Sequence, residues 1–367
     1  MTKLNICIVS LTVFPDNTSG ASRVVRSLFE YLRNQGHNVK LITAKWNVNL
    51  NDPDIIQVKI IRKRFLWFPQ FNLKVARFLR KNKFDIIHGD GAKGSLPIII
   101  SNQKKFISTI HDLGPFETKF TKIPIEKILM KFIARRATRI TTVSNFIRKE
   151  FKYYLPKVKS DKIYTLYNGI DQNFRPYPDE ARKLKEKLKI SGPVLLYLGR
   201  IAPYKDVGNI ILAYKIAKKK INNLNLIIGG TPDFAMEKQY LEWKKENEEV
   251  HFVGFIPEEQ MPYYYTMGDI FITYSFASEG FGLTPVEAIA CGTPVICSSI
   301  LAYREVLQEN AVFVPIKEPE LLAKQIINLL EDDKKRINLT QKAQTFIKRY
   351  SWDVVGKNLE KIYENML

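Results

Sequence analysis

Residues 270–299 read IFITYSFASEGFGLTPVEAIACGTPVICSS, and this stretch indicates the fold more clearly than any other part of the chain. Ile270–Tyr274 and Pro294–Cys297 are short apolar runs, which are typical of buried parallel strands. Between them lie a glycine-rich segment, Pro285 and Gly292, and proline and glycine favour the start and the end of a helix respectively. The stretch therefore predicts one βαβ unit: a strand, a glycine-rich loop, a helix and a second strand.

The same alternation of apolar runs and amphipathic segments extends in both directions along the 367 residues, which are enough for two domains. It predicts an α/β fold of two doubly wound, Rossmann-like domains with a ligand cleft at the carboxyl ends of the strands. We expect the first domain at residues 1–168 and the second at 169–351, with a final helix at 352–367 that packs back on the first. The expected strands lie at 5–11, 39–43, 55–61, 85–88, 105–110, 140–143, 164–167, 194–198, 225–228, 251–253, 270–274, 294–297 and 311–314.

The net charge of +20 is confined to the first half of the chain. Residues 1–168 contain 31 Lys and Arg against 11 Asp and Glu, whereas residues 169–367 contain 26 of each. Such an asymmetry indicates an anionic partner for the first domain.

Cysteine content and hydropathy indicate the compartment. The cysteines Cys7, Cys291 and Cys297 form no metal-binding spacing, and an odd number leaves one unpaired, which favours reduced thiols in the cytoplasm. The apolar stretch at residues 4–14 is expected to be the first strand rather than a signal peptide. Because no run reaches the ~20 apolar residues of a membrane span, any membrane contact would be peripheral.

Two glutamates lie near the start of the predicted helix. Glu279 is in the glycine-rich loop before it, and Glu287 is on the helix itself. Thr284 is a candidate N-cap, and its spacing from Glu287 is that of a capping box, which would give Glu287 a purely structural role. Alternatively, Glu279, Glu287 and the helix N-terminus at Gly282, Leu283 and Thr284 surround a ligand, whose diphosphate would accept hydrogen bonds from backbone N–H groups.

The segment from Glu279 to Glu287 resembles the E-x7-E signature of retaining GT-B glycosyltransferases, in particular glycosyltransferase family 4. Four further segments agree with that family in order and position, and the likeness runs from about residue 5 to residue 366. They are Thr109-Ile110-His111-Asp112, Val143-Ser144-Asn145, Asn168-Gly169-Ile170-Asp171 and Gly199-Arg200 followed by Lys205.

The resemblance implies a role for each matching residue. Arg200 and Lys205 would clamp the diphosphate of a nucleotide sugar, because guanidinium binds it bidentately and ammonium adds a point charge. Glu279 would bind donor hydroxyls, and His111 would contact the transferred sugar. The remaining matches are the diphosphate-binding loop at Gly20, where the family often has two glycines and this chain has Gly20-Ala21, and the base-packing residues Phe255 and Ile256.

Each of these residues also has a structural interpretation. Arg200 and Lys205 could be solvated loop cations, and Phe255 and Ile256 could belong to the core. His111 could pair with Asp112 to fix a turn. His88 could line the acceptor side or pack a loop, whereas His37 and His251 are expected to be structural.

The resemblance implies a glycosyltransferase that uses a UDP- or GDP-sugar and retains the anomeric configuration without an obligatory metal. Retention can proceed through a covalent intermediate, for which no carboxylate is identified, or through same-face attack assisted by the leaving phosphate, which we favour. The motif Asp52-Pro53-Asp54 imitates a metal-binding Asp-x-Asp pair, but its composition predicts a turn.

Two basic segments of the first half bear on the acceptor. Between Asp54 and Asp85 and again over Lys119–Arg139, cations alternate with apolar side chains, which suits either an anionic membrane surface with a lipid or lipid-linked glycan acceptor, or a solvated face over a core. The aromatics of the first segment are Phe65, Trp67, Phe68, Phe71 and Phe78, and the apolar residues of the second are Ile125, Ile128, Leu129, Phe132 and Ile133.

Three other functions stay open. A GT-B epimerase or phosphorylase would share the fold, although no pyridoxal-phosphate lysine motif is evident. A nucleic-acid-binding protein would explain the charge, but no known binding module occurs. An inactive scaffold is disfavoured because His111, Arg200, Lys205, Glu279 and Glu287 are all present.

Overall fold

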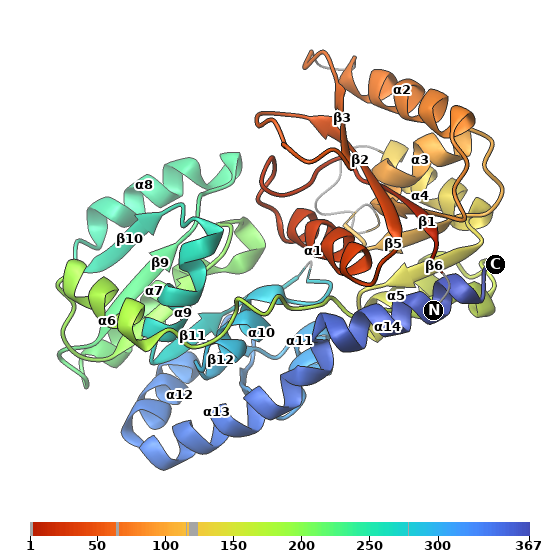
Figure 1. Ribbon diagram of the computed structural model, residues 1–367. Coiled ribbons are helices and arrows are strands. Elements are labelled where there is room, and N and C mark those ends of the chain that lie inside the picture. The colour runs from red at the N-terminus through yellow and green to blue at the C-terminus, as the bar shows by residue number, and fades with distance from the viewer. Residues whose placement is uncertain (1–2, 64–65, 115, 117–123, 278) are drawn as a thin grey trace. The chain divides into compact units, whose positions relative to one another are not determined.

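The computed structural model describes residues 3–63, 66–114, 116, 124–277 and 279–367. The chain forms two compact units, coloured along the sequence in Figure 1. Unit 1 contains residues 1–169 together with 352–367, and unit 2 contains residues 170–351. Each unit is an α/β domain built on its own parallel sheet.

The sheet of unit 1 has seven parallel strands in the order β3-β2-β1-β4-β5-β6-β7. Strands β2 and β3 lie on one side of β1, and strands β4 to β7 lie on the other. The order therefore reverses between β1 and β4. The strands are β1 (Asn5–Val9), β2 (Asn38–Lys45), β3 (Ile55–Lys59), β4 (Ile86–Asp90), β5 (Ile107–Ile110), β6 (Arg139–Thr142) and β7 (Ile163–Thr165).

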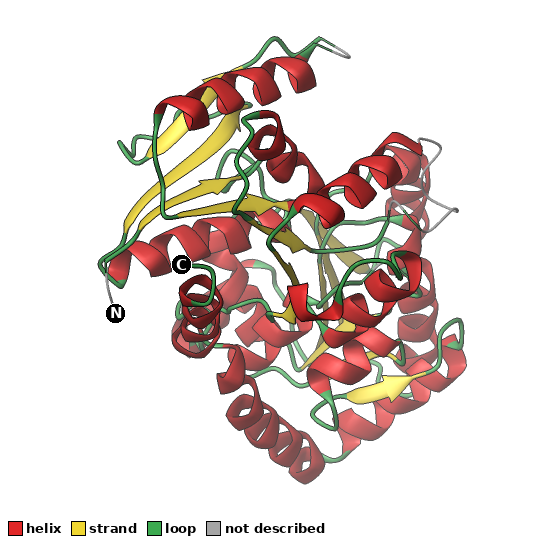
Figure 2. Cartoon of the chain, turned by 90° about the vertical axis from the view of Figure 1, so that its right-hand side faces the viewer, coloured by secondary structure: helices red, strands yellow, loops and turns green. Residues whose placement is uncertain are grey.

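Buried apolar side chains explain why these segments are strands. Ile6, Ile8 and Val9 of β1 are almost fully buried, as expected for a central strand covered on both faces. Figure 2 shows the strands with helices packed against them. The helices of unit 1 are α1 (Gly20–Asn34), α2 (Trp67–Lys81), α3 (Gly91–Ile100), α4 (Pro124–Arg136), α5 (Asn145–Tyr154) and α14 (Trp352–Glu364).

The terminal helix α14 belongs to unit 1 and packs on α1. Its residue Glu360 is buried, accepts a hydrogen bond from the Tyr31 hydroxyl at 3.0 Å, and lies 3.0 Å from Nε2 of His37. Trp352 stacks on the Tyr31 ring, with ring centroids 6.0 Å apart. His37 is therefore structural, as the sequence predicts.

The sheet of unit 2 has six parallel strands in the order β10-β9-β8-β11-β12-β13, and its order reverses between β8 and β11. The strands are β8 (Val194–Leu198), β9 (Asn225–Gly229), β10 (Val250–Gly254), β11 (Ile270–Thr273), β12 (Val295–Ser298) and β13 (Val312–Val314). The helices are α6 (Pro178–Lys187), α7 (Val207–Lys218), α8 (Glu237–Glu246), α9 (Met261–Met267), α10 (Leu283–Ala290), α11 (Leu301–Leu307), α12 (Pro319–Glu331) and α13 (Asp333–Ile347). Cys7, Cys291 and Cys297 are buried free thiols.

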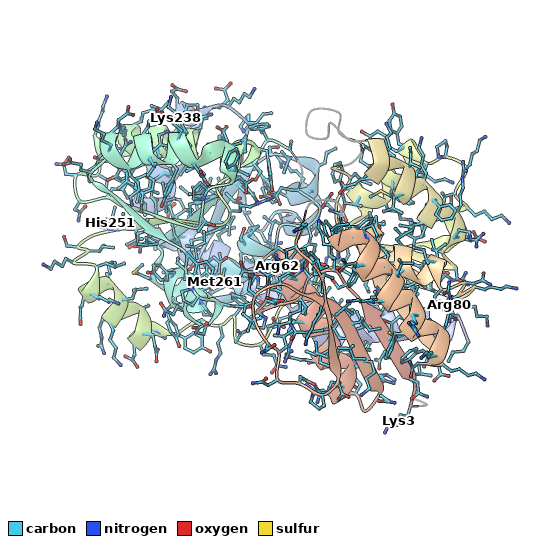
Figure 3. All side chains as sticks on the ribbon, turned by 90° about the horizontal axis from the view of Figure 1, so that it is seen from above. Lys3, Arg62, Arg80, Lys238, His251 and Met261 are labelled. Carbon is cyan, nitrogen blue, oxygen red and sulfur yellow. The ribbon has the colours of Figure 1, made fainter. Side chains whose placement is uncertain are left out.

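Two sequence predictions about loops and strands can be compared directly with the structure. Asp52-Pro53-Asp54 precedes β3, and its carboxylates pair with Arg33 (2.7 Å from Asp52) and Lys40 (2.6 Å from Asp54). His251, labelled in Figure 3, lies on β10. The Asp-Pro-Asp segment therefore forms a turn held by ion pairs, as the sequence predicts, and His251 lies on a strand.

Candidate active site

One cluster of candidate residues lies in unit 2 at the carboxyl ends of β8 and β11, where the strand order reverses. Doubly wound sheets bind ligands at this position, because adjacent loops diverge there. Gly199 follows β8 and Gly230 follows β9. A Cβ atom on Gly230 would lie 1.9 Å from the Gly199 carbonyl oxygen, and φ of Gly230 is +131°, so only glycine lets these two loops approach.

Lys205 and Glu279 form the buried centre of this cluster. The Lys205 ammonium pairs with Oε1 of Glu279, which also accepts a hydrogen bond from the Ser275 hydroxyl at 2.8 Å. The Lys205 and Glu279 side chains are only 14% and 10% exposed. Burial lowers the pKa of Lys205, but the Glu279 charge outweighs it and raises the pKa above its ordinary value. Lys205 is therefore a fixed cation at neutral pH.

Arg200 lies in the same cluster and is much more accessible, with 60% of its side chain exposed. It donates a hydrogen bond to the Tyr204 hydroxyl at 3.1 Å and lies 3.5 Å from a carboxylate oxygen of Asp233. Its carbonyl oxygen accepts a hydrogen bond from Tyr197. The backbone is thus anchored while the guanidinium stays open to an anionic ligand.

Helix α10 begins two residues earlier than the sequence predicts. Its N-cap is Gly282 at φ +83°, without a side-chain cap, so the prediction of Thr284 as N-cap is wrong. A Cβ atom on Gly282 would lie 2.5 Å from the Tyr303 ring, which explains why a glycine starts the helix. The predicted end is confirmed, since Gly292 follows the helix at φ +88°.

Glu287 is buried on α10 and does not form the capping box. Its side chain is turned into unit 2, where Oε2 accepts a hydrogen bond from the Tyr265 hydroxyl at 2.9 Å. Because Thr284 is already the second residue of α10, Glu287 lies beyond the first turn and cannot close the predicted box. The hydroxyl of Tyr265 is a partner that sequence reasoning missed.

Phe255 and Ile256, at the end of β10, have different environments. Phe255 is 55% exposed, whereas Ile256 is buried. The Ile256 side chain covers Gly229, where an added Cβ atom would lie 2.4 Å from it. Ile256 therefore belongs to the core, and Phe255 is the aromatic ring available to a ligand.

A second cluster lies in unit 1 at the carboxyl ends of β1, β4 and β5. His111 follows β5, and its Nε2 lies 2.5 Å from a carboxylate oxygen of Asp90 at the end of β4. The other carboxylate oxygen of Asp90 accepts a hydrogen bond from the hydroxyl of Ser10, which follows β1, at 2.8 Å. Asp112 instead accepts from the N–H of Gly114 at 3.0 Å, so the partner of His111 is Asp90 rather than its neighbour in sequence.

His88, on β4, lies near His111, and both of its ring nitrogens have hydrogen-bond partners within unit 1. His88 is buried, with Nδ1 2.7 Å from the Tyr363 hydroxyl and Nε2 2.6 Å from that of Thr109. Burial lowers the pKa of His88 to about 4, so it is neutral and packs α14 on the sheet. His88 also lines a small pocket in unit 1, together with Ile8, Val25, Leu28, Asp90, His111 and Trp352.

Gly20 begins α1, next to a network of hydroxyl groups. Ser19 is the N-cap and accepts a hydrogen bond from the N–H of Ser22 at 3.3 Å. The Ser22 hydroxyl in turn bonds to Thr12 and Asn17 at 2.8 and 2.9 Å. These hydrogen bonds connect the loop before α1 to the first turn of the helix.

Within the described ranges, no group of three or more His, Cys, Asp and Glu side chains could hold a metal ion. In the same part of the chain, no helix is long and apolar enough to cross a membrane. Ser278 of the quoted loop lies outside the described residues.

Comparison with known proteins gives the family. The model "Glycosyltransferase Family 4" matches residues 18–174, and the model "Glycosyl transferases group 1" matches residues 180–346. The chain belongs to the family 4 glycosyltransferases. It is therefore an enzyme of the GT-B fold that transfers a sugar from a nucleotide-sugar donor.

Similar glycosyltransferases cover nearly the whole chain. An alpha-monoglucosyldiacylglycerol synthase of Acholeplasma laidlawii is 26% identical and covers 95% of this chain and 94% of its own length. A phosphatidyl-myo-inositol mannosyltransferase of Mycolicibacterium smegmatis is 24% identical, with coverages of 96% and 91%. The solved structure of Anabaena HepE with UDP and glucose superposes with a TM-score of 0.83 at 18% identity, covering 98% of this chain and 99% of that one. This last similarity shows the fold.

Proposed function

We propose that this glycosyltransferase moves a hexose from a UDP-sugar to a lipid or lipid-linked glycan, with retention of configuration and without an obligatory metal. The observation that carries the proposal is the cluster of Arg200, Lys205 and Glu279 at the reversal point of the unit 2 sheet. Its two cations, one open and one buried, suit a ligand with a compact double negative charge.

The donor would lie along this cluster. Arg200 and Lys205 would bind the diphosphate, and the backbone N–H groups at the start of α10, from Gly282 to Thr284, would add hydrogen bonds, because the first turn of a helix has no internal acceptors for them. Phe255 would pack on the base. We place UDP before GDP because the similar HepE structure contains UDP.

Retention would follow from attack on the face that the leaving phosphate occupies. The Glu279 carboxylate contacts Lys205 and Ser275 through Oε1, which supports a role in binding donor hydroxyls rather than as a nucleophile. His111 would contact the transferred sugar. Arg200 and Lys205 would stabilise the leaving diphosphate electrostatically, a task that a metal ion performs in other enzymes.

The proposed acceptor is based on two relatives and one surface. The names of the two relatives describe enzymes acting on diacylglycerol and phosphatidylinositol lipids. In this chain, α4 exposes Ile128 and Phe132, which are 63% and 43% exposed, and α2 exposes Leu73 at 63%. Exposed cations flank them, and we propose that this basic face binds an anionic membrane on its cytoplasmic side. These cations are Lys74, Arg77, Arg80, Lys81, Lys131, Arg135 and Arg136.

The apolar side chains of the two basic segments are divided between the core and the surface. Phe71 of α2 and Leu129 and Ile133 of α4 are core residues, while Trp67, Phe68 and Phe78 are half-buried. Arg62 and Arg80, labelled in Figure 3, lie before α2 and near its end. Arg64, Phe65, Lys119 and the side chain of Ile125 lie outside the described residues.

The test is a screen of the purified protein against UDP, GDP, ADP and CMP by isothermal titration calorimetry, followed by transfer assays with the matching sugars. We expect UDP to bind selectively, so that its titration gives a heat of binding to the folded protein and the titrations of the other three nucleotides do not. Transfer should persist in EDTA, and NMR of the product should show the donor's anomeric configuration.

Three results would contradict the proposal separately. Selective binding of GDP would change the donor, an inverted product would exclude retention, and loss of transfer in EDTA that Mg²⁺ restores would exclude metal independence. Binding of none of the nucleotides, together with tight salt-sensitive binding of nucleic acid, would favour the nucleic-acid alternative.

A further inference from the structure

We propose that Asp90, supported by Ser10, is a positioning residue that fixes the His111 ring and directs its Nδ1 atom toward the sugar substrate. This inference rests on the proposed contact of His111 with the transferred sugar. It concerns unit 1 alone, where all three residues lie.

The three residues come from three neighbouring strands of the sheet. Ser10 directly follows β1, Asp90 ends β4 and His111 directly follows β5. The strand order reverses between β1 and β4, so the group lies at the position where such sheets bind ligands. The His111 and Asp90 side chains are 15% and 14% exposed, so both are largely but not completely buried.

The hydrogen bonds determine which ring nitrogen carries the proton. An ionised carboxylate only accepts hydrogen bonds, so Nε2 of His111, at 2.5 Å from Asp90, must be the donor. The Ser10 hydroxyl lies 2.8 Å from the other Asp90 oxygen and 2.7 Å from the carbonyl oxygen of Thr12. In the described part of the chain, Nδ1 of His111 has no hydrogen-bond partner, so it is the atom that can meet a substrate.

Asp90 occupies a position where its side chain would normally serve the backbone. It is the N-cap of α3, and aspartate at an N-cap usually accepts a hydrogen bond from the first helical turn. Here the Asp90 side chain makes no such bond. Its two oxygens bind His111 and Ser10 instead, which is expected if the carboxylate is required for the histidine.

The charged and titratable groups around His111 are Asp90, Asp112 and His88. Burial alone lowers the pKa of His111, but the charge and the hydrogen bond of Asp90, with a smaller effect of Asp112, raise it above the ordinary value. His88 is neutral because burial lowers its pKa to about 4. The arrangement therefore favours the imidazolium form, in which Nδ1–H can donate a hydrogen bond to a sugar oxygen.

The first experiment is an NMR titration of the four histidines in the protein without substrate. Variants in which one histidine at a time is replaced assign the signals. Asp90→Asn should lower the pKa of His111 by about 1 or more, because it removes a negative charge at hydrogen-bond distance. Asp112→Asn removes the same charge without a hydrogen bond to the ring, and it should have a smaller effect. Asp90→Glu retains the charge and should keep the pKa raised, and it replaces Asp90→Asn if that variant does not fold.

The second experiment measures transfer rates against pH in the parent and the Asp90 variants. Activity that needs the imidazolium is lost as the pH rises through the pKa of His111. In Asp90→Asn this loss should occur at lower pH, with kcat at neutral pH reduced about tenfold or more and the donor KM little changed. Asp90→Glu should keep the pH profile but lower kcat, since the carboxylate is displaced.

An unchanged His111 titration in Asp90→Asn, or an unshifted pH profile, would overturn the inference. An equal effect of Asp112→Asn on the titration would also contradict it, because the effect would then be one of charge alone. If no nucleotide sugar is a donor, the proposed function fails on its own, whereas the titration still decides whether Asp90 controls the His111 ring.

Discussion

The ion pair between Lys205 and Glu279 is nearly excluded from water. Two buried charges of opposite sign stabilise each other, and removal of one leaves the other uncompensated. If the donor binds as proposed, Glu279 would compete with the incoming diphosphate for the Lys205 ammonium. The carboxylate would then have to share this cation or move toward the sugar hydroxyls.

This competition gives a prediction for Glu279→Gln. The variant should bind free UDP at least as tightly as the parent, because the ammonium no longer has an anionic partner, but it should lose most of its transfer activity. Calorimetry and a transfer assay measure the two effects. Clearly weaker UDP binding in a folded variant would mean that Glu279 does not compete for Lys205.

The buried Glu287 carboxylate gives a second prediction at this scale. Tyr265→Phe removes the hydroxyl that donates to Oε2 and should lower the free energy of unfolding of unit 2 by about 1.5–3 kcal/mol, as for hydrogen bonds to charged groups. The control is Tyr264→Phe, at a neighbouring buried tyrosine. Equal losses in urea unfolding would mean that the hydrogen bond contributes nothing.

Sequence spacing could predict the cluster members but not all of their partners. Arg200, Lys205 and Glu279 follow strands whose carboxyl ends meet, so their proximity follows from the predicted sheet. Asp90 also follows a predicted strand, yet its pairing with His111 depends on the order β1-β4-β5, which the pattern of apolar runs does not contain. The prediction of Thr284 as the N-cap is wrong because Gly282 already occupies that position.

At the scale of elements, α14 is held on unit 1 by contacts that local propensity does not reveal. Gly356 of α14 faces the Tyr31 ring, where an added Cβ atom would lie 2.1 Å from ring carbons. The helix periodicity of 352–367 predicts a buried face, and Val355, Leu359 and Ile362 are indeed buried. Which helix covers that face follows only from the three-dimensional structure.

Gly356→Ala tests this close approach. Alanine is the better helix former by about 1 kcal/mol, yet the methyl group would collide with Tyr31, and we expect a net loss of about 1–3 kcal/mol in stability, typical of overpacking. Asn358→Ala, on the exposed side of α14, should be neutral or slightly stabilising. Thermal and urea unfolding compare the two, and a stabilised Gly356→Ala would refute the packing.

At the scale of the whole molecule, the charge asymmetry and the division into two sheets were predictable because both are sums over many residues. The repeated alternation of apolar runs gives two doubly wound domains, and each observed strand overlaps its predicted segment. The exposure of Ile128 and Phe132 was not predictable, since their helical spacing is also that of core residues. It depends on which face of α4 meets the sheet.

The proposed membrane contact makes a prediction at this scale. The parent should bind vesicles of phosphatidylcholine containing about one third phosphatidylglycerol, with binding that weakens in high salt. The double variant Ile128→Ser/Phe132→Ser should bind several-fold more weakly, whereas Leu241→Ser, at an exposed leucine of α8, should not. Sedimentation with the vesicles measures this, and equal binding of all three proteins would exclude α4 as the contact.

The most direct test of the account is the affinity of Arg200→Ala for UDP, measured by isothermal titration calorimetry. Arg200 is 60% exposed, so its removal should leave the fold intact while deleting a charged contact with the diphosphate. We expect about 10–100-fold weaker binding, with parent-like binding in the control Arg182→Ala, whose arginine pairs with Asp179 on the surface of unit 2. Parent-like affinity in Arg200→Ala would contradict the assignment of the donor site to this cluster.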